Sequence, residues 1–323
     1  MTQPHIPAAY AARRFTPRVE ATLAERYRLT RNEADTVLSA DELAKAAKGA
    51  DYIVVSVTER VTRAVIEALL PELKVIATLS VGTDHVDLQA AREHGIAVLT
   101  TPDVLSAACA DLALMLILAA MRRASEGDRM VRADAWPGWA PTQLLGKGME
   151  GRKLGIFGMG RIGREVAKRA KGFGVELHYH NRSRLSPDLE DGAIYHADVN
   201  DLLAVSEIFC FCAPGGGALA NFLDADRIAR LPQDAVLVNV SRGDVVNDDA
   251  LIAALKSGHL FAAGLDVFRG EPNIDPRYRE LDNVFLLPHL GSATVETRDA
   301  MGFLLLDGLR AYEAGERSAN RID

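Results

Sequence analysis

Several features are scarce in this sequence, and each scarcity excludes a class of protein. Only three of its 323 residues are cysteine, which does not suit a disulfide scaffold and makes a reducing, cytoplasmic location the expected one. The longest apolar run, residues 112–121, is too short to span a bilayer, and residues 1–15 contain no apolar stretch typical of a signal peptide. Acidic residues outnumber basic ones by 44 to 37, and the net charge of −7 argues against a nucleic-acid-binding or anionic-membrane-binding surface.

Two of the cysteines form a C-x-C pair, which raises the question of a metal site. Cys210 and Cys212 alternate with Phe209 and Phe211 along an apolar stretch. On a strand of this kind a C-x-C pair is far more often part of the core than a metal site. We therefore expect apolar surroundings for these thiols and no bound metal.

The sequence contains a repeated alternation of short apolar stretches and helical segments. With 48% hydrophobic and 25% charged residues it is typical of a globular protein, and its length allows two domains. The alternation predicts α/β units with parallel sheets. Thr101-Pro102 marks a change in character and predicts a boundary. We expect a smaller domain formed by residues 1–101 and 292–323, and a second domain formed by residues 102–291.

The expected elements follow from apolar periodicity and from the positions of Gly, Pro and capping residues. In the smaller domain we expect strands at 52–57, 75–79 and 96–99, a poorly marked strand within 8–15, and helices at 17–27, 39–48, 63–70, 88–94 and 295–312. Ser39 and Glu42 form a candidate capping box. In the second domain we expect strands at 154–157, 175–180, 208–212, 235–239, 261–266 and 284–287. Residues 104–123 are predicted to form one long helix, and residues 125–151 are predicted to be irregular.

The clearest local signal is a glycine-rich turn between two strands. An apolar strand leads into Gly158-Met159-Gly160-Arg161-Ile162-Gly163, and a helix and a second strand follow. This order is the one that a dinucleotide-binding turn requires. The first glycine allows the bend, the second lets a pyrophosphate approach the backbone, and the third lets the helix pack on the strand. The helix N-terminus then supplies free N–H groups and a positive dipole end.

The residues after the second strand bear on the choice of cofactor. An NAD site usually has an acidic residue there, which accepts a hydrogen bond from the ribose 2′-hydroxyl. This sequence has Asn181-Arg182-Ser183-Arg184 and no carboxylate before Asp188. Because an arginine suits a 2′-phosphate and a carboxylate would repel it, NADPH is favoured, with NADH as the weaker alternative. The remaining alternative is that both arginines are solvated loop charges.

Chemically suitable side chains follow three further strands of the second domain. Arg242 can hold a carboxylate bidentately and polarise a keto group. His289 can donate a proton near neutral pH, and Glu271 on its other nitrogen would keep the imidazole charged. Asp266 is a candidate acceptor for the nicotinamide carboxamide. Taken singly each signal is weak, but all of them lie where the strands of a dinucleotide-binding fold carry their ligands.

Five motifs in one order carry a resemblance to a known family: SVGTDHVDL, the glycine-rich turn, VNVSRG, GLDVFRGEP and LPHLGSAT. From about Tyr52 to the end, the chain resembles the D-isomer-specific 2-hydroxyacid dehydrogenases. This implies an NAD(P)-dependent oxidoreductase with a Rossmann-type doubly wound parallel sheet domain and a smaller flavodoxin-like α/β substrate domain. It also implies that Arg242 binds and polarises the substrate, that His289 is the acid/base, and that Glu271 is its partner.

The resemblance implies a full set of binding residues as well. The substrate carboxylate would be held by backbone groups of Ser80, Val81 and Gly82. The implied substrate-binding set also includes Arg242, His289 and Trp139. The implied cofactor-binding residues are Gly158, Met159, Gly160, Arg161, Ile162, Gly163, Asn181, Arg182, Ser183, Ala213, Pro214, Val240, Asp266 and Gly291.

Within the family, the Asn-Arg-Ser segment and a W-P-G-W-A-P loop resemble the NADPH-linked glyoxylate/hydroxypyruvate reductases. The expected reaction is the reduction of small 2-keto acids to 2-hydroxy acids, with His289 as proton donor. In that group a loop tryptophan reaches the neighbouring subunit's site, so the resemblance implies a homodimer with Trp139 in this role. One departure is Ala213-Pro214-Gly215-Gly216-Gly217, where the family commonly has a polar Thr-Pro-Glu-Thr-like loop. Three glycines are expected to widen and loosen this wall of the cofactor site.

Two alternatives stay open at this point. The chain could be another member of the family, of the 2-ketogluconate, phosphoglycerate or phosphite type. It could also be a cofactor-sensing scaffold similar to the family's corepressor relatives. A scaffold would tolerate loss of the Arg242, Glu271 and His289 triad, and this sequence has all three residues.

Overall fold

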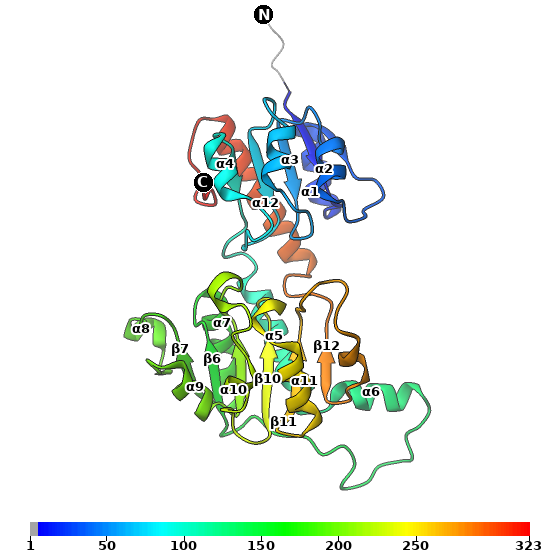
Figure 1. The fold of residues 1–323 in the computed structure, drawn as a ribbon, viewed down its shortest axis with the longest axis vertical. Coiled ribbons are helices and arrows are strands. Elements are labelled where there is room, and N and C mark those ends of the chain that lie inside the picture. The colour runs from blue at the N-terminus through cyan, green and yellow to red at the C-terminus, as the bar shows by residue number, and fades with distance from the viewer. Residues whose placement is uncertain (1–5) are drawn as a thin grey trace, which may run out of the picture. The chain divides into compact units, whose positions relative to one another are not determined.

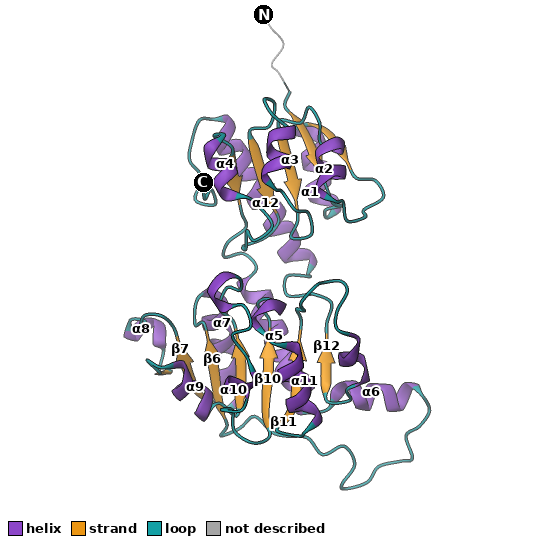
Figure 2. Cartoon of the chain, viewed as in Figure 1, coloured by secondary structure: helices purple, strands orange, loops and turns teal. Residues whose placement is uncertain are grey.

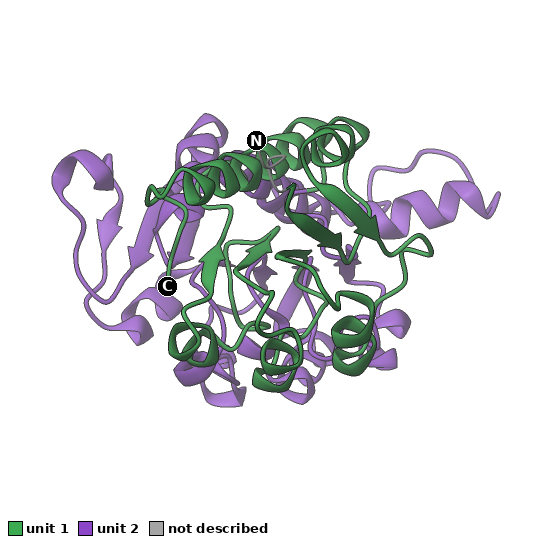
Figure 3. Cartoon of the chain, turned by 90° about the horizontal axis from the view of Figure 1, so that it is seen from above, with its two compact units in different colours: residues 1–105, 293–323 green, residues 106–292 purple. Residues whose placement is uncertain are grey.

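A computed structural model describes residues 6–323 and divides the chain into two compact units (Figure 3). Unit 1 consists of the segment that ends at Leu105 together with Ala293–Asp323, and unit 2 is Ser106–Ser292. Each unit contains one parallel sheet with helices on both faces (Figures 1 and 2). Among the described residues, no helix is both long enough and apolar enough to cross a membrane.

Unit 1 contains a five-stranded sheet in the order β2-β1-β3-β4-β5. Its strands are β1 (Ala8–Ala11), β2 (Arg28–Arg31), β3 (Tyr52–Val55), β4 (Val75–Thr78) and β5 (Ala97–Leu99). Its helices are α1 (Pro17–Arg26), α2 (Ala40–Ala46), α3 (Arg63–Ala68), α4 (Leu88–Glu93) and α12 (Val295–Glu313). Helices α2, α3 and α4 follow one another on one face, and α1 and α12 pack together on the other. This strand order confirms the flavodoxin-like prediction.

The burial of the strands in unit 1 explains why the sequence predicts only part of its sheet. Every residue of β1, β3, β4 and β5 is buried, since helices cover both faces, and such strands read as continuous apolar runs. Strand β2 has the sequence RLTR, lies at the sheet edge and alternates between exposed and half-buried residues, so it was not predicted. The capping box at α2 is confirmed: the Ser39 hydroxyl accepts from the Glu42 N–H at 3.3 Å, and the Glu42 carboxylate accepts from the Ser39 N–H at 2.8 Å.

Unit 2 contains a seven-stranded sheet in the order β12-β11-β10-β9-β6-β7-β8. Its strands are β6 (Lys153–Phe157), β7 (Glu176–His180), β8 (Ile194–Tyr195), β9 (Ile208–Phe211), β10 (Ala235–Asn239), β11 (Leu260–Leu265) and β12 (Val284–Leu286). Its helices are α5 (Ser106–Met121), α6 (Ala124–Arg132), α7 (Arg161–Ala170), α8 (Pro187–Glu190), α9 (Val199–Val205), α10 (Ala225–Ile228) and α11 (Asp248–Lys256). Short 3₁₀ turns occupy Lys171–Phe173, Gly217–Leu219, Gly243–Val245 and Pro276–Glu280. Counted from β6, the order is that of a doubly wound dinucleotide fold, whose direction reverses between β6 and β9.

The core of unit 2 has two parts, one on each side of the sheet. Helices α5 and α7 pack together on one side, and α9, α10 and α11 pack on the other. Strand β9 contributes to both, because successive side chains point to opposite faces. Cys210 lies in the cluster on the α5 and α7 side, with Cys212 packed against it, whereas Phe209 and Phe211 lie in the other cluster. The C-x-C pair therefore lines the core.

The structure corrects the expectation that residues 125–151 are wholly irregular. Helix α6 occupies Ala124–Arg132 and lies near β12, with an extended loop after it (Figure 1). No residue of α6 is buried, so it lacks the apolar stripe that periodicity detects. Ion pairs between Arg132 and Asp128 and between Arg123 and Glu126 support it. Strand β8, two residues long and not predicted, completes the β7 edge of the sheet.

Candidate functional site

The turn after β6 is shaped by two glycines that have no room for a side chain. Gly158 has a φ of 93°, and a Cβ there would lie 2.4 Å from the Ala213 nitrogen. A Cβ on Gly163 would lie 2.4 Å from the Gly158 carbonyl oxygen, so α7 packs directly on the turn. Gly160 is different, because a Cβ there would meet nothing within 4 Å. The open space lies where the fold brings a pyrophosphate close to the backbone.

The N-terminus of α7 is also suited to an anion. The helix begins at Arg161 with Gly160 as its N-cap residue, and no side chain caps its first N–H groups. Such groups and the helix dipole together favour a bound phosphate. The residues of this turn therefore fit a dinucleotide, and a nicotinamide dinucleotide bound there would supply or accept a hydride. Among the described residues, no cluster of His, Cys, Asp or Glu is arranged to hold a metal ion.

Some of the residues after β7 already make hydrogen bonds within the protein, and others are available to a ligand. The Asn181 side chain accepts from the Met159 N–H at 2.7 Å and so ties β7 to the glycine turn. Arg184 donates to both carboxylate oxygens of Glu190, at 2.8 and 3.1 Å. Arg182 is exposed and has no hydrogen bond or ion pair within residues 6–323. Of the two arginines, Arg182 is thus the one available to a ligand.

The turn after β10 presents Arg242. Asn239, the last residue of β10, is fully buried; its amide nitrogen donates to the Arg242 carbonyl at 2.8 Å and its oxygen accepts from the Ser241 N–H at 3.0 Å. The Ser241 hydroxyl donates to the carbonyl of Ala213, in the loop after β9. Val240 N–H donates to the Phe211 carbonyl at 3.4 Å. These bonds fix the backbone of Arg242 while its side chain stays partly exposed.

Gly243 joins the Arg242 turn to the loop that carries Glu271. A Cβ on Gly243 would lie 1.8 Å from the Phe268 carbonyl carbon, so the two backbones are in direct contact. Arg269 secures the same junction by donating to the Asn221 side chain at 2.6 Å and to the Asp244 carbonyl at 3.1 Å. The motifs VNVSRG and GLDVFRGEP are therefore packed against each other through their glycine and arginine positions.

Glu271 and His289 form a hydrogen-bonded pair. His289 Nδ1 lies 2.8 Å from one carboxylate oxygen of Glu271, and the other oxygen accepts from the Phe268 N–H at 2.7 Å. Burial by itself would raise the pKa of Glu271, but the hydrogen bonds from His289 and Phe268 and the positive charge of Arg242 lower it. An ionised carboxylate on Nδ1 fixes the orientation of the imidazole and leaves Nε2 for proton transfer.

Asp266, at the end of β11, fixes the segment that carries His289. Its two carboxylate oxygens accept from the backbone N–H groups of Leu290, at 2.7 Å, and Gly291, at 2.9 Å. Only 1% of Asp266 is exposed. This burial raises its pKa to about 6, although the Leu290 and Gly291 N–H groups and the His289 charge oppose the shift. Sequence reasoning considered Asp266 only as a cofactor ligand; its support of the histidine loop emerges from the structure.

In unit 1 the turn after β4 has its own chain of hydrogen bonds. The Ser80 N–H is used within the turn, donating to the Thr78 carbonyl at 2.8 Å. The Ser80 hydroxyl donates to the Gly82 carbonyl at 2.7 Å, and Thr78 Oγ1 lies 2.8 Å from Ser80 Oγ and 2.7 Å from the Nε2 of buried His85. The motif SVGTDHVDL locates this turn in the sequence, but it does not reveal that Thr78 and His85 support the turn, although His85 stands in the motif.

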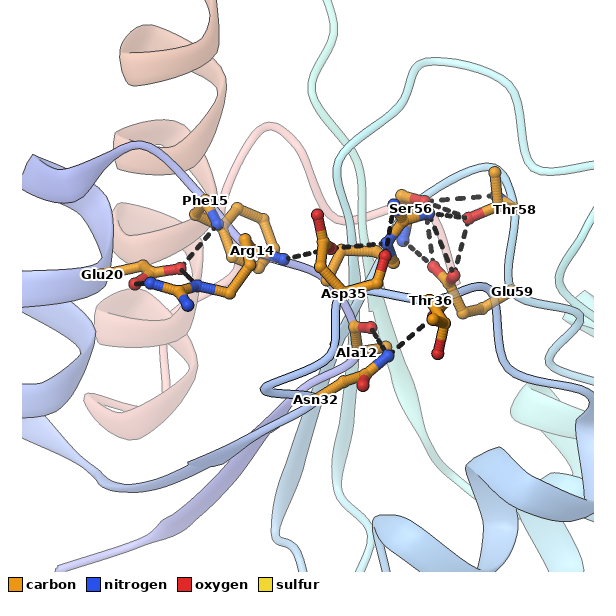
Figure 4. A network of polar contacts seen from close by, with 11 residues as sticks. Ala12, Arg14, Phe15, Glu20, Asn32, Asp35, Thr36, Ser56, Thr58 and Glu59 are labelled. Atoms are coloured by element: carbon orange, nitrogen blue, oxygen red, sulfur yellow. Dashed lines mark hydrogen bonds and ion pairs between the residues drawn. The ribbon is translucent and has the colours of Figure 1, made fainter.

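A polar network braces the neighbouring loops of unit 1 (Figure 4). Glu59 is fully buried and accepts from both the N–H and the hydroxyl of Ser56, each at 2.9 Å. Arg13, which follows β1, donates to Asp35 at 2.8 Å. Val61, in the segment after β3, forms a parallel bridge with Val86, and its N–H donates to the carbonyl of His85 at 2.8 Å. The turn is therefore held by its neighbours as well as by its own hydrogen bonds.

Trp139 lies in the extended loop after α6 and is 81% exposed. Trp136 in the same loop is 55% exposed and donates to the Gln143 side chain at 3.2 Å. Tryptophan side chains are enriched at protein interfaces, where one end of the ring system is buried and the other is wet.

Taken together, unit 2 gathers most of the predicted site residues at one sheet edge. The ends of β6, β7, β9, β10, β11 and β12 carry the glycine turn, Asn181–Ser183, Ala213 and Pro214, Val240 to Arg242, Asp266 with Glu271, and His289 with Gly291. Ser80, Val81 and Gly82 belong to unit 1, and Trp139 belongs to the loop after α6 and does not follow a strand.

Comparison with known proteins identifies the family. Residues 114–291 match the model of the D-isomer specific 2-hydroxyacid dehydrogenase, NAD binding domain. The chain is 38% identical over 304 residues to a glycerate dehydrogenase from Hyphomicrobium methylovorum, covering 93% of this chain and 94% of that protein. A crystal structure from Polaromonas sp. JS6 66, assigned to the NAD-binding D-isomer specific 2-hydroxyacid dehydrogenases, is 59% identical and has a TM-score of 0.96, covering 99% of this chain and all of that one.

A further solved structure is that of an NADPH-dependent glyoxylate/hydroxypyruvate reductase from Sinorhizobium meliloti in complex with NADP and malonate. It is 32% identical, with a TM-score of 0.87, and covers 98% of this chain and 97% of that one. The family model, the relative and the two structures all point to the same family. This chain belongs to the D-isomer specific 2-hydroxyacid dehydrogenases, oxidoreductases with an NAD-binding domain.

Proposed function

We propose that this protein reduces small 2-keto acids, glyoxylate and hydroxypyruvate first, to 2-hydroxy acids with NADPH. The observation that carries the proposal is the contact of 2.8 Å between His289 Nδ1 and Glu271, with Arg242 in the adjoining turn. In this assignment unit 2 binds the dinucleotide and unit 1 is the substrate domain. The relative from Hyphomicrobium methylovorum is in keeping with this, since glycerate is the product of hydroxypyruvate reduction.

His289 is proposed to donate the proton to the substrate's keto oxygen. A bound NADPH would supply the hydride, and the reduction would place negative charge on this oxygen. His289 then transfers its Nε2 proton to the oxygen, and Glu271 stabilises the charged imidazole before the transfer. The lowered pKa of Glu271 keeps it ionised at neutral pH, so it acts as a hydrogen-bond acceptor throughout.

Arg242 is proposed to bind the substrate through its guanidinium, which can donate two hydrogen bonds to a carboxylate and keto oxygen in one plane. The turn after β4 is proposed to hold the carboxylate through backbone N–H groups. Since the Ser80 N–H already donates to Thr78, the groups of Val81 and Gly82 are the better candidates. Together, these donors suit a substrate that has a carboxylate next to a keto group.

The preference for NADPH rests on Arg182. It is exposed and without a partner in the described part of the chain, and no carboxylate stands between it and Asp188. Asn181 is expected to act mainly by holding the Met159 backbone, with Arg182 and Ser183 facing the 2′-phosphate. The reductase from Sinorhizobium meliloti, solved with NADP, is consistent with this choice.

We further propose that the protein is a homodimer. Trp139 is the most exposed of the large apolar side chains in residues 6–323, and a partner subunit would bury it. As the family resemblance implies, it would reach the partner's substrate site. Sedimentation of the wild type and of Trp139→Ser tests this: weaker association in the variant supports the proposal, and a monomeric wild type contradicts it.

The main test is initial-rate oxidation of NADPH and of NADH with glyoxylate, hydroxypyruvate, pyruvate and 2-ketogluconate. Rapid turnover of the first two with NADPH is expected. His289→Ala should lower the rate by about 10²–10⁴-fold, while NADPH binding, followed by its fluorescence, stays unchanged. A preference for 2-ketogluconate would contradict the proposed substrates. Near-normal turnover in His289→Ala would contradict the proposed role of His289.

A further inference from the structure

Gly215, in the loop after β9, lies directly against the side chain of Arg242. A Cβ on Gly215 would lie 2.3 Å from the Arg242 Cβ and 2.4 Å from its Cγ. Non-bonded carbon atoms normally stay about 3.5–4.0 Å apart, so no side chain fits at Gly215 unless one of the two segments moves. The backbone of Gly215 is not in the left-handed region, and an alanine there would be opposed by this contact and not by its own φ.

The loop that carries Gly215 is fixed to its surroundings. The Ala213 N–H donates to the Phe157 carbonyl at 2.9 Å, and the Ala213 carbonyl accepts from the Ser241 hydroxyl. The Gly158 backbone also packs so closely on Ala213 that it excludes a Cβ. The loop is thus anchored to the dinucleotide turn and to the residue before Arg242, which leaves it little room to retreat.

The backbone of Arg242 is fixed as well. Asn239 holds its carbonyl at 2.8 Å, and Gly243 is packed on the Phe268 backbone. With both backbones held, a Cβ at position 215 would press on the Cβ and Cγ of Arg242, the atoms that set the direction of the rest of its side chain. A small displacement there becomes a larger displacement at the guanidinium, several bonds further out.

We propose that Gly215 is a positioning residue for substrate binding, because its missing side chain leaves the space that the base of Arg242 occupies. At Gly215 the loop is therefore packed closely against Arg242, where the sequence suggested a widened cofactor wall. This inference rests on the role assigned to Arg242 under the proposed function.

The test is a double-mutant cycle with a matched control. The variants are Gly215→Ala, Arg242→Gly and the double variant, and Gly172→Ala is the control, since a Cβ on Gly172 would meet nothing within 4 Å. For each we would measure kcat and KM for glyoxylate at saturating NADPH, inhibition by oxamate as a stable 2-keto-acid analogue, NADPH binding by fluorescence, and thermal unfolding by circular dichroism.

Gly215→Ala is expected to lower kcat/KM for glyoxylate by about 10–100-fold and to weaken oxamate inhibition, because a misplaced binding group loses rate in this range. NADPH binding should change by less than about twofold, and Gly172→Ala should resemble the wild type. In the Arg242→Gly background, which lacks both Cβ and Cγ, the added Gly215→Ala should have little further effect, as expected for residues that act through one contact.

Three results would overturn the inference. One is a Gly215→Ala enzyme with wild-type kcat/KM. Another is a Gly215→Ala substitution that lowers kcat/KM equally in the wild-type and Arg242→Gly backgrounds, which would show that it does not act through Arg242. The third is a parallel loss of NADPH binding, which would make Gly215 part of the cofactor wall. Failure of the proposed function is distinguishable from these: Arg242→Gly alone would then leave glyoxylate turnover unchanged, or the wild type would show none.

Discussion

The backbone N–H of His289 donates to the carbonyl oxygen of Asp266 at 2.8 Å. His289 has a φ of 55°, a left-handed conformation that residues with a Cβ seldom adopt. Such a conformation persists only where the surroundings fix it, and the Asp266 carboxylate does so by accepting from the next two N–H groups. The direction of the imidazole therefore depends on Asp266, the residue that follows β11.

Asp266→Asn should weaken catalysis although the side chain keeps its size. Both carboxylate oxygens accept N–H groups, whereas an amide offers one acceptor and turns its NH₂ group towards the other N–H. An unsatisfied buried donor costs about 1–3 kcal/mol, enough to release the His289 segment. We expect kcat/KM for glyoxylate to fall by about tenfold or more, as measured by steady-state kinetics. The exposed Asp188→Asn serves as the control, and equal activity of both variants would contradict the prediction.

The stability of the protein should depend on the titration of Asp266. Burial raises its pKa from 3.8 to about 6, so the folded state binds this proton more tightly than the unfolded state. The resulting stabilisation is complete below the unfolded pKa and is lost as the pH rises through the folded pKa. From pH of about 8 to about 4, the wild type should therefore gain up to about 3 kcal/mol relative to Asp266→Asn. Urea unfolding at several pH values measures this, and a constant difference would refute it.

Glu271→Gln should slow the reduction and change its pH dependence. The lowered pKa of Glu271 means that its stabilising charge is present above the ordinary carboxyl range and is lost only as the pH falls through the lowered value. The variant lacks this charge beside His289, so the protonated imidazole loses support. We expect the rate at about pH 8 to fall by 10–100-fold and the upper limb of the pH–rate profile to move to lower pH. An unshifted profile, like that expected of the exposed control Glu280→Gln, would exclude this role.

Arg182→Ala should weaken NADPH binding much more than NADH binding. Arg182 has no partner among residues 6–323, whereas Arg184 is held by both oxygens of Glu190. A lost charge-assisted contact of this kind corresponds to about 1.5–3 kcal/mol, or about 10–100-fold in affinity. Fluorescence titration with each cofactor measures the ratio. Arg184→Ala is the matched control, and equal losses for both cofactors in Arg182→Ala would rule out a 2′-phosphate contact.

Gly163→Ala should damage the dinucleotide turn. The new Cβ would lie 2.4 Å from the Gly158 carbonyl oxygen and 3.2 Å from the Ile156 side chain, so α7 would have to move away from β6. We expect destabilisation of about 1–3 kcal/mol, together with loss of NADPH affinity, measured by thermal unfolding and fluorescence titration. Gly172→Ala should leave both unchanged. A Gly163→Ala protein with normal cofactor affinity would show that the close packing is dispensable.

Much of the fold could be predicted because many elements carry local signals. The apolar strands β3, β4 and β10 and the capping box at α2 appear within a few residues of their predicted positions. Helix α6 and strand β2 were missed because neither buries a stripe of apolar side chains. Their formation depends on ion pairs and on pairing at a sheet edge, which periodicity does not record.

The sequence by itself determined the order of most strands and helices, the glycine turn and the residue types available for chemistry. Only the tertiary structure decided that Glu271 and His289, 18 residues apart, lie 2.8 Å from each other, and that Gly215 lies against Arg242. The physical reason is that parallel pairing brings strand ends to one edge, while hydrogen bonds between distant loops set the final positions. The partner of Asp266 is likewise a backbone segment that no local pattern identifies.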